Sequence, residues 1–62
     1  MNISVIVNNY VLGARVRITP THKITSQERI DSRHTQIIYS DVTERERVFI
    51  EKALSHKTKV ID

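Results

Sequence analysis

The chain contains no cysteine, and its 62 residues include only one glycine, one proline and three aromatic residues. The absence of cysteine excludes disulfide bonds, thiolate zinc sites and thiol catalysis, and it favours a cytoplasmic location. With a single glycine, the chain has no glycine-rich loop that could cradle a phosphate group. Three aromatic side chains are also few for a sheet on which the bases of single-stranded nucleic acid could stack.

Long apolar runs are also missing. The longest stretches, such as Val5–Val7, fall far short of the roughly 20 residues that cross a lipid bilayer. The first residues lack the basic start of a secretory signal peptide, and Asn2, Asn8 and Asn9 interrupt the apolar positions. We therefore expect neither a membrane segment nor a leader peptide.

The length of the chain fits one small domain that spans residues 1–62. A domain of this size buries a small core, and disulfides, a metal or a partner usually reinforce it. Disulfides are excluded, and the widely spaced His22, His34 and His56 show no pattern of zinc ligands, so neither a metal nor another cofactor is expected. Association remains as the reinforcement, and we expect a homodimer or other homo-oligomer, or an obligate complex with another molecule.

The first third of the chain shows the alternation of a β-hairpin. Apolar residues recur at every second position of residues 3–7, which is the period of a strand. Asn8–Asn9 follows, and because asparagine tolerates positive φ, the pair predicts a two-residue turn. In this register residues 10–18 form the second strand and Tyr10 faces the core, whereas a turn at Leu12–Gly13 would give a different register.

Residues 21–34 permit two interpretations. Thr25 with Glu28 has the form of a capping box, which favours a short helix, but that helix would have few apolar residues to bury. We favour the alternative, in which a second hairpin turns near Asp31–Ser32. The β-branched and aromatic residues of 35–40 predict a strand after it.

Residues 42–55 predict an amphipathic α-helix. Ser40 and Asp41 are suitable N-caps, and Thr43 with Glu46 makes a further capping box. Acidic residues lie in the first turns and basic residues in the last, as the helix dipole favours. Arg47 and Glu51 are four residues apart and are expected to pair on the solvent side. At about 100° per residue, one side collects the residues expected to face a sheet: Val42, Phe49, Ile50, Ala53 and Leu54.

A short final strand is expected in residues 59–62, and the elements together predict an α+β fold. Its sheet is small and antiparallel, built from the N-terminal hairpin and one or two further strands, and the C-terminal helix packs on one face. No nucleophile signature occurs, and a chain of this size rarely encloses the pocket that Glu28 and Asp31 would need for acid–base catalysis. We therefore expect a non-enzymatic protein without a small-molecule substrate.

The formal net charge is +3, and the excess of basic residues lies within residues 1–40. Arg15 and Arg17, two apart on the predicted second strand, would project from its outer face about 6–7 Å apart, so that both could contact one phosphate backbone. The leading hypothesis is therefore a small binding or regulatory protein whose basic strand surface contacts the backbone of DNA or RNA. Its residues, which would otherwise serve as ordinary surface charge, are Arg15, Arg17, Lys23, Arg29 and Arg33.

A protein partner is the alternative ligand. Three apolar residues that are expected to stay outside the core suggest a contact surface: Ile6, Val11 and Val48. The chain would then act as a protein-binding modulator, such as a small inhibitor or an assembly component. The two hypotheses differ in salt dependence, because phosphate contacts weaken steeply with ionic strength and an apolar interface does not.

Overall fold

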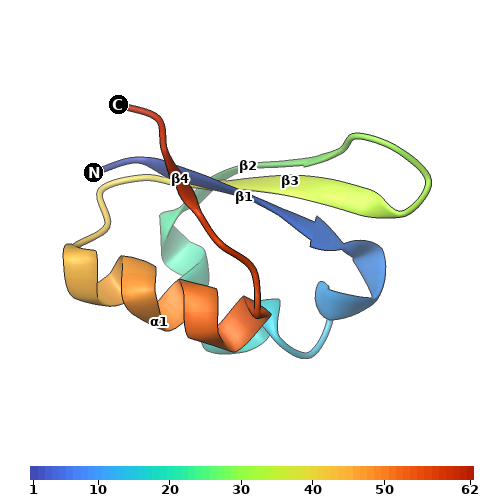
Figure 1. The fold of residues 1–62 in the computed structure, drawn as a ribbon, viewed down its shortest axis with the longest axis horizontal. Helices are drawn as coiled ribbons and strands as arrows, with labels where there is room; N and C mark the ends of the chain where they lie inside the picture. Colours follow the sequence, from blue (N-terminus) through green and yellow to red (C-terminus); the bar gives the residue numbers. More distant parts are fainter.

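The computed structural model describes residues 1–62, which form two layers (Figure 1). A four-stranded antiparallel sheet forms one layer, and one α-helix with three short 3-10 helices forms the other. The predicted α+β fold, with a C-terminal helix on a small antiparallel sheet, is thereby confirmed. In chain order the elements are β1 (Ile3–Asn8), η1 (Asn9–Val11), η2 (Val16–Ile18), η3 (Thr21–Lys23), β2 (Ile24–Arg29), β3 (His34–Tyr39), α1 (Glu44–Leu54) and β4 (Lys59–Val60).

The strands lie in the order β2–β3–β1–β4, and each neighbouring pair is antiparallel. β3 and β4 therefore run in the same direction with β1 between them, and α1 connects them as in a split βαβ unit. β1 and β2 are related in the same way across β3, with 3-10 helices in place of a second α-helix. The order of elements is that of a ferredoxin-like sheet with one helix replaced, a topology that by itself carries no function.

The predicted N-terminal hairpin is wrong. β1 pairs with β3 and β4, and the chain leaves the sheet after Asn8, so residues 10–18 contain no strand. Asn9 anchors this departure to the turn between β2 and β3: its backbone N–H donates to the carbonyl O of Arg33 (2.8 Å), and its Nδ2 donates to the carbonyl O of Ser32 (3.3 Å). Four of the six β3 residues opposite β1 are aromatic or β-branched, namely Thr35, Ile37, Ile38 and Tyr39, and this nonlocal pairing prevails over a local turn.

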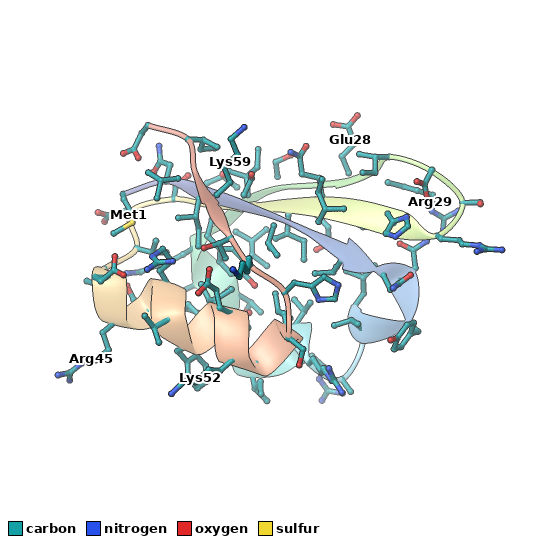
Figure 2. All side chains as sticks on the ribbon, in the orientation of Figure 1. Met1, Glu28, Arg29, Arg45, Lys52 and Lys59 are labelled. Carbon is teal, nitrogen blue, oxygen red and sulfur yellow. The ribbon has the colours of Figure 1, made fainter.

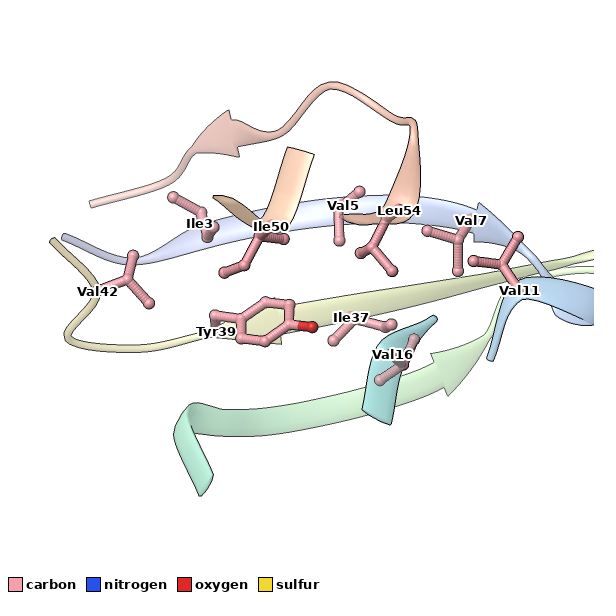
Figure 3. Close-up of a cluster of buried hydrophobic side chains, with 10 residues drawn as sticks. All are labelled: Ile3, Val5, Val7, Val11, Val16, Ile37, Tyr39, Val42, Ile50 and Leu54. Atoms are coloured by element: carbon pink, nitrogen blue, oxygen red, sulfur yellow. The ribbon is translucent and has the colours of Figure 1, made fainter. Parts of the chain in front are cut away.

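The core lies between the sheet and the second layer (Figure 3). The register sets Ile3 opposite Tyr39 and Val5 opposite Ile37, so these side chains share the face of the sheet that α1 covers. The other face of the sheet carries no second layer. Ten apolar side chains are buried in one cluster: Ile3, Val5, Val7, Val11, Val16, Ile37, Tyr39, Val42, Ile50 and Leu54.

The hairpin predicted within residues 21–34 is confirmed by the pairing of β2 with β3. Asp31 holds its turn, because the Oδ1 atom accepts hydrogen bonds from the backbone N–H groups of Arg33 (2.7 Å) and His34 (2.8 Å). The pKa of the Asp31 carboxyl is lowered, mainly because of the hydrogen bond from the Arg33 backbone N–H. The short helix that Thr25 would have capped does not form.

α1 begins at the predicted capping box. The Thr43 Oγ1 accepts a hydrogen bond from the backbone N–H of Glu46 (3.1 Å), and the Glu46 carboxylate accepts one from the backbone N–H of Thr43 (2.8 Å). The helix ends at Leu54, because Ser55 adopts a left-handed conformation with φ 57°. The local signals of residues 43–55 therefore fix both ends of the helix.

The buried side of α1 is narrower than predicted. Ile50 and Leu54, one turn apart, are fully buried against the sheet, and Val42 is buried just before the helix. The prediction for Phe49 is wrong, since 47% of this residue is exposed. Ala53, also predicted to face the sheet, is half-buried. The sheet covers mainly the ridge of Ile50 and Leu54, and Phe49 on the flank of that ridge meets solvent beside η2.

Arg47 and Glu51 pair as predicted, with 3.1 Å between Nη1 and Oε2, and the pair also fixes the segment that leads to β4. The Glu51 carboxylate accepts hydrogen bonds from the backbone N–H (2.7 Å) and the hydroxyl (2.9 Å) of Thr58. The backbone bond is the largest cause that lowers the pKa of Glu51. β4 then pairs with β1, which confirms the short final strand.

Candidate functional site

Most carboxylates of the chain are engaged within the molecule, whereas most cations are not. The carboxylates of Glu28 and Asp41 accept no hydrogen bond. Those of the other five acidic residues do: Asp31, Glu44, Glu46, Glu51 and Asp62. Among the lysines and arginines, only Lys23 and Arg47 form salt bridges. The cations without a carboxylate partner are Arg15, Arg17, Arg29, Arg33, Arg45, Lys52, Lys57 and Lys59. Eight cations thus lack a carboxylate partner, whereas only two carboxylates accept no hydrogen bond.

Lys23 is the exception among the five cations that the sequence assigned to nucleic-acid binding. Its Nζ lies 2.7 Å from Glu46 Oε1 and 2.9 Å from the carbonyl O of Asp41, and only 22% of its side chain is exposed. The hydrogen bond from Lys23 is the largest cause that lowers the pKa of Glu46, followed by the bond from the Thr43 backbone. Lys23 therefore joins η3 to the start of α1, and we leave it out of the candidate site.

Arg29 and Arg33 lie apart from the other predicted cations. Arg29 ends β2, and Arg33 belongs to the turn between β2 and β3. Figure 2 shows Arg29 at the far end of this hairpin, away from α1. In the same hairpin, Asp31 Oδ1 and His34 Nδ1 lie 3.1 Å apart, within hydrogen-bond distance. The five cations assigned from the sequence thus do not form one continuous patch.

Arg15 and Arg17 are exposed, but the strand that should carry them does not exist. Arg15 directly precedes η2 and Arg17 belongs to it, so the spacing of 6–7 Å along a strand was wrong. The Arg15 Nη1 donates to the Ser55 Oγ at 3.3 Å, which brings it to the C-terminal end of α1. Both arginines therefore belong to the helix-bearing layer rather than to a sheet surface.

A shallow groove of about 420 Å³ lies between η2 and α1, and the sequence did not predict it. Its apolar walls are accessible, since Ile18 is 61% exposed and Phe49 is 47% exposed. The one carboxylate of its lining, Glu46, is already bound to Lys23. The residues that line the groove are Ile18, Thr19, Pro20, Arg45, Glu46 and Phe49.

Two free cations flank Phe49 along α1. Arg45 lies four residues before it and Lys52 three residues after it, and both positions share its side of the helix. Figure 2 shows the side chains of Arg45 and Lys52 pointing away from the sheet. The spacing of these three residues is visible in the sequence, but it did not suggest a surface site because Phe49 was expected to lie in the core.

Tyr10 is also misplaced by the sequence prediction. The expected register buried it, whereas in η1 it is 81% exposed. Only Tyr39 among the three aromatic residues is fully buried. Aromatic surface is therefore more available to a ligand than the sequence indicated.

The three apolar residues assigned to a protein interface do not form one surface. Val11 is buried in the core, so its assignment is wrong. Ile6 is exposed on the face of the sheet without a second layer, because it alternates with the buried Val5 and Val7. Val48 is exposed on α1, in the other layer.

No group of three or more His, Asp or Glu side chains is arranged to hold a metal ion. α1 is too short and too polar to cross a lipid bilayer. Comparison of the chain with models of protein families, with curated proteins and with solved structures finds no match.

Proposed function

We propose that this chain is a small, non-enzymatic binding protein that contacts the backbone of nucleic acid. The contact surface is formed by η2 and the adjacent side of α1, and we call it the η2–α1 surface. Its residues are Arg15, Arg17, Ile18, Arg45, Phe49 and Lys52. The observation that carries the proposal is the presence there of free cations around an exposed aromatic residue, with no free carboxylate between them.

The charges of this surface suit a chain of phosphates. Guanidinium groups bind phosphate through forked N–H donors, and a lysine supplies a mobile point charge. Arg45 and Lys52 are seven residues apart on α1, which corresponds to about 10 Å along the helix axis. Two phosphates of one strand, with a nucleotide between them, can therefore be contacted by the two side chains. A cytoplasmic location, favoured by the absence of cysteine, is part of the same proposal.

A pair of matched double variants tests the location of the binding surface. Arg45→Ala with Lys52→Ala removes two cations from the η2–α1 surface, and Arg29→Ala with Lys59→Ala removes two from elsewhere (Figure 2). Each is titrated by fluorescence anisotropy against random-sequence single-stranded DNA and RNA at several salt concentrations. The first variant should bind more weakly, and its salt slope should fall by about 1.4, at about 0.7 for each lost phosphate contact on a single strand.

The second variant controls for net charge, because it has the same total charge as the first. The salt slope of this control variant should stay closer to that of the wild type. Equal losses in both variants would show that binding reflects net charge alone. No binding by the wild type at low salt would refute the proposal.

A protein-binding modulator remains the second candidate function, and the aliphatic lining of the groove favours it. Ile18 and Pro20 form a wall that would also accept an apolar side chain of a partner. Such an interface weakens little with ionic strength. Absence of nucleic-acid binding, together with salt-resistant association that Ile18→Ser abolishes, would promote this candidate.

A further inference from the structure

We infer that the groove between η2 and α1 receives one unpaired base, so that the ligand of this protein is single-stranded nucleic acid. The inference rests on the proposed function and extends it from the backbone to the bases. It is carried by the position of Phe49, whose exposed side chain forms a wall of the groove between two free cations.

The shape of the groove suits the flat face of a base. Phe49 contributes an aromatic surface from α1, and Ile18 and Pro20 contribute apolar surface from the 3-10 segment. Bases stack on aromatic side chains with little regard to sequence, because every base has a π-face. The groove, of about 420 Å³, also lies within the range of sites that hold small ligands.

The polar side chains that line the groove are already paired, except Arg45, so they do not repel the phosphates on either side of a bound base. Glu46 would repel a phosphate if it were free, but its carboxylate binds Lys23 Nζ at 2.7 Å and the Thr43 N–H at 2.8 Å. The Thr19 hydroxyl is buried and bound to the Val16 carbonyl O and to Tyr39. Arg45 is then the one charged group of the lining without a partner.

Charge on both sides of the apolar groove favours a polyanion over an apolar peptide. Arg45 and Lys52 lie on opposite sides of Phe49 along the helix, and a nucleotide strand carries a phosphate on each side of every base. A base within a duplex has both faces covered by its neighbours, so only an unpaired base can offer a face to Phe49. The ligand is therefore expected to be single-stranded.

Three labelled oligonucleotides of equal length separate the base from the backbone. They are oligo-dT, an abasic strand with the same phosphates, and a duplex, each titrated by anisotropy at several salt concentrations. The wild type should bind oligo-dT about 5- to 150-fold more tightly than the abasic strand, which corresponds to one stacked base. Phe49→Leu should abolish this preference and leave the salt slope unchanged, and Phe49→Tyr should retain the preference.

The ring signals of Phe49 give a second readout that does not depend on a variant. Phe49 is the only phenylalanine, so its ring protons in an NMR spectrum are assigned without ambiguity. They should shift on addition of oligo-dT and stay unmoved on addition of the abasic strand. Equal affinity for the two strands, or an unmoved ring, would overturn the inference and leave backbone binding intact. Absence of binding to every probe would overturn both proposals.

Discussion

A buried chain of hydrogen bonds attaches the 3-10 segment to the sheet, and its direction predicts which substitution costs more. The Thr19 Oγ1 donates to the Val16 carbonyl O at 2.6 Å, and it lies 2.6 Å from the Tyr39 hydroxyl. A threonine hydroxyl has one proton to donate, so Tyr39 must be the donor to Thr19. Both residues are buried, with exposures of 5% and 0%.

The two single substitutions leave different groups without a partner. Tyr39→Phe removes the donor but keeps the bond from Thr19 to Val16, so it should cost about 0.5–1.5 kcal/mol. Thr19→Val keeps the shape but leaves the Tyr39 hydroxyl buried without an acceptor, which should cost about 1–3 kcal/mol. The Val16 carbonyl O keeps a second partner, the backbone N–H of Thr19 at 3.0 Å, and adds little to that cost. The double variant should lose less free energy of unfolding than the two single variants together.

Urea unfolding followed by circular dichroism measures all three variants. Small domains unfold with a free energy of only about 5–15 kcal/mol, so differences of this size shift the midpoint clearly. A larger loss for Tyr39→Phe than for Thr19→Val would refute the assigned direction of the bonds. Additive losses within about 0.5 kcal/mol would show that the two hydroxyls do not interact.

Three further predictions follow from burial, protonation and association. Leu54→Ala should cost about 2–5 kcal/mol in urea unfolding and Phe49→Leu less than about 1 kcal/mol, and the reverse order would contradict the narrow buried side of α1. The hydrogen bonds from Lys23 to Glu46 and from the Thr58 N–H to Glu51 hold the pKa values of both carboxyls below the ordinary 4.5, so their contribution to stability is present above pH 4.5 and lost as the pH falls through the lowered values. Glu51→Gln should therefore reduce the loss of unfolding free energy at acid pH, and an unchanged acid dependence would contradict this. Light scattering should detect a homodimer or larger homo-oligomer, and a stable, partner-free monomer at high micromolar concentration would contradict the expected association.

The parts of the fold that depend on local signals could be predicted from the sequence. The capping box of Thr43 and Glu46 and the apolar pair Ile50 and Leu54 lie within one segment, and they predicted α1 correctly. The hairpin of β2 and β3 also joins neighbouring strands across a short turn. In both cases the residues that stabilise the element are close to one another in the chain.

The errors arose where distant segments decide the outcome. Alternation showed which side chains of β1 share a face, but not that β3 and β4 would be its partners. The helical pattern gave the direction of Phe49, but not how wide an arc of α1 the sheet would cover. The chemical type of Arg15 and Arg17 correctly predicted exposure, whereas their place beside α1 depends on where η2 packs.

The strand order has a consequence for how the chain folds. β2 and β3 are the only sheet neighbours that follow each other in sequence, so their pairing costs the least loop-closure entropy. The pairing of β1 with β3 closes a loop that contains the 3-10 segment and β2, and its pairing with β4 closes a loop of nearly the entire chain. The two ends meet in the finished sheet, where the Asn2 N–H donates to Asp62 Oδ1 at 2.9 Å (Figure 1). This high contact order predicts slow folding for so short a chain, and in pulsed hydrogen exchange the amides of β2 and β3 should become protected before those of β4.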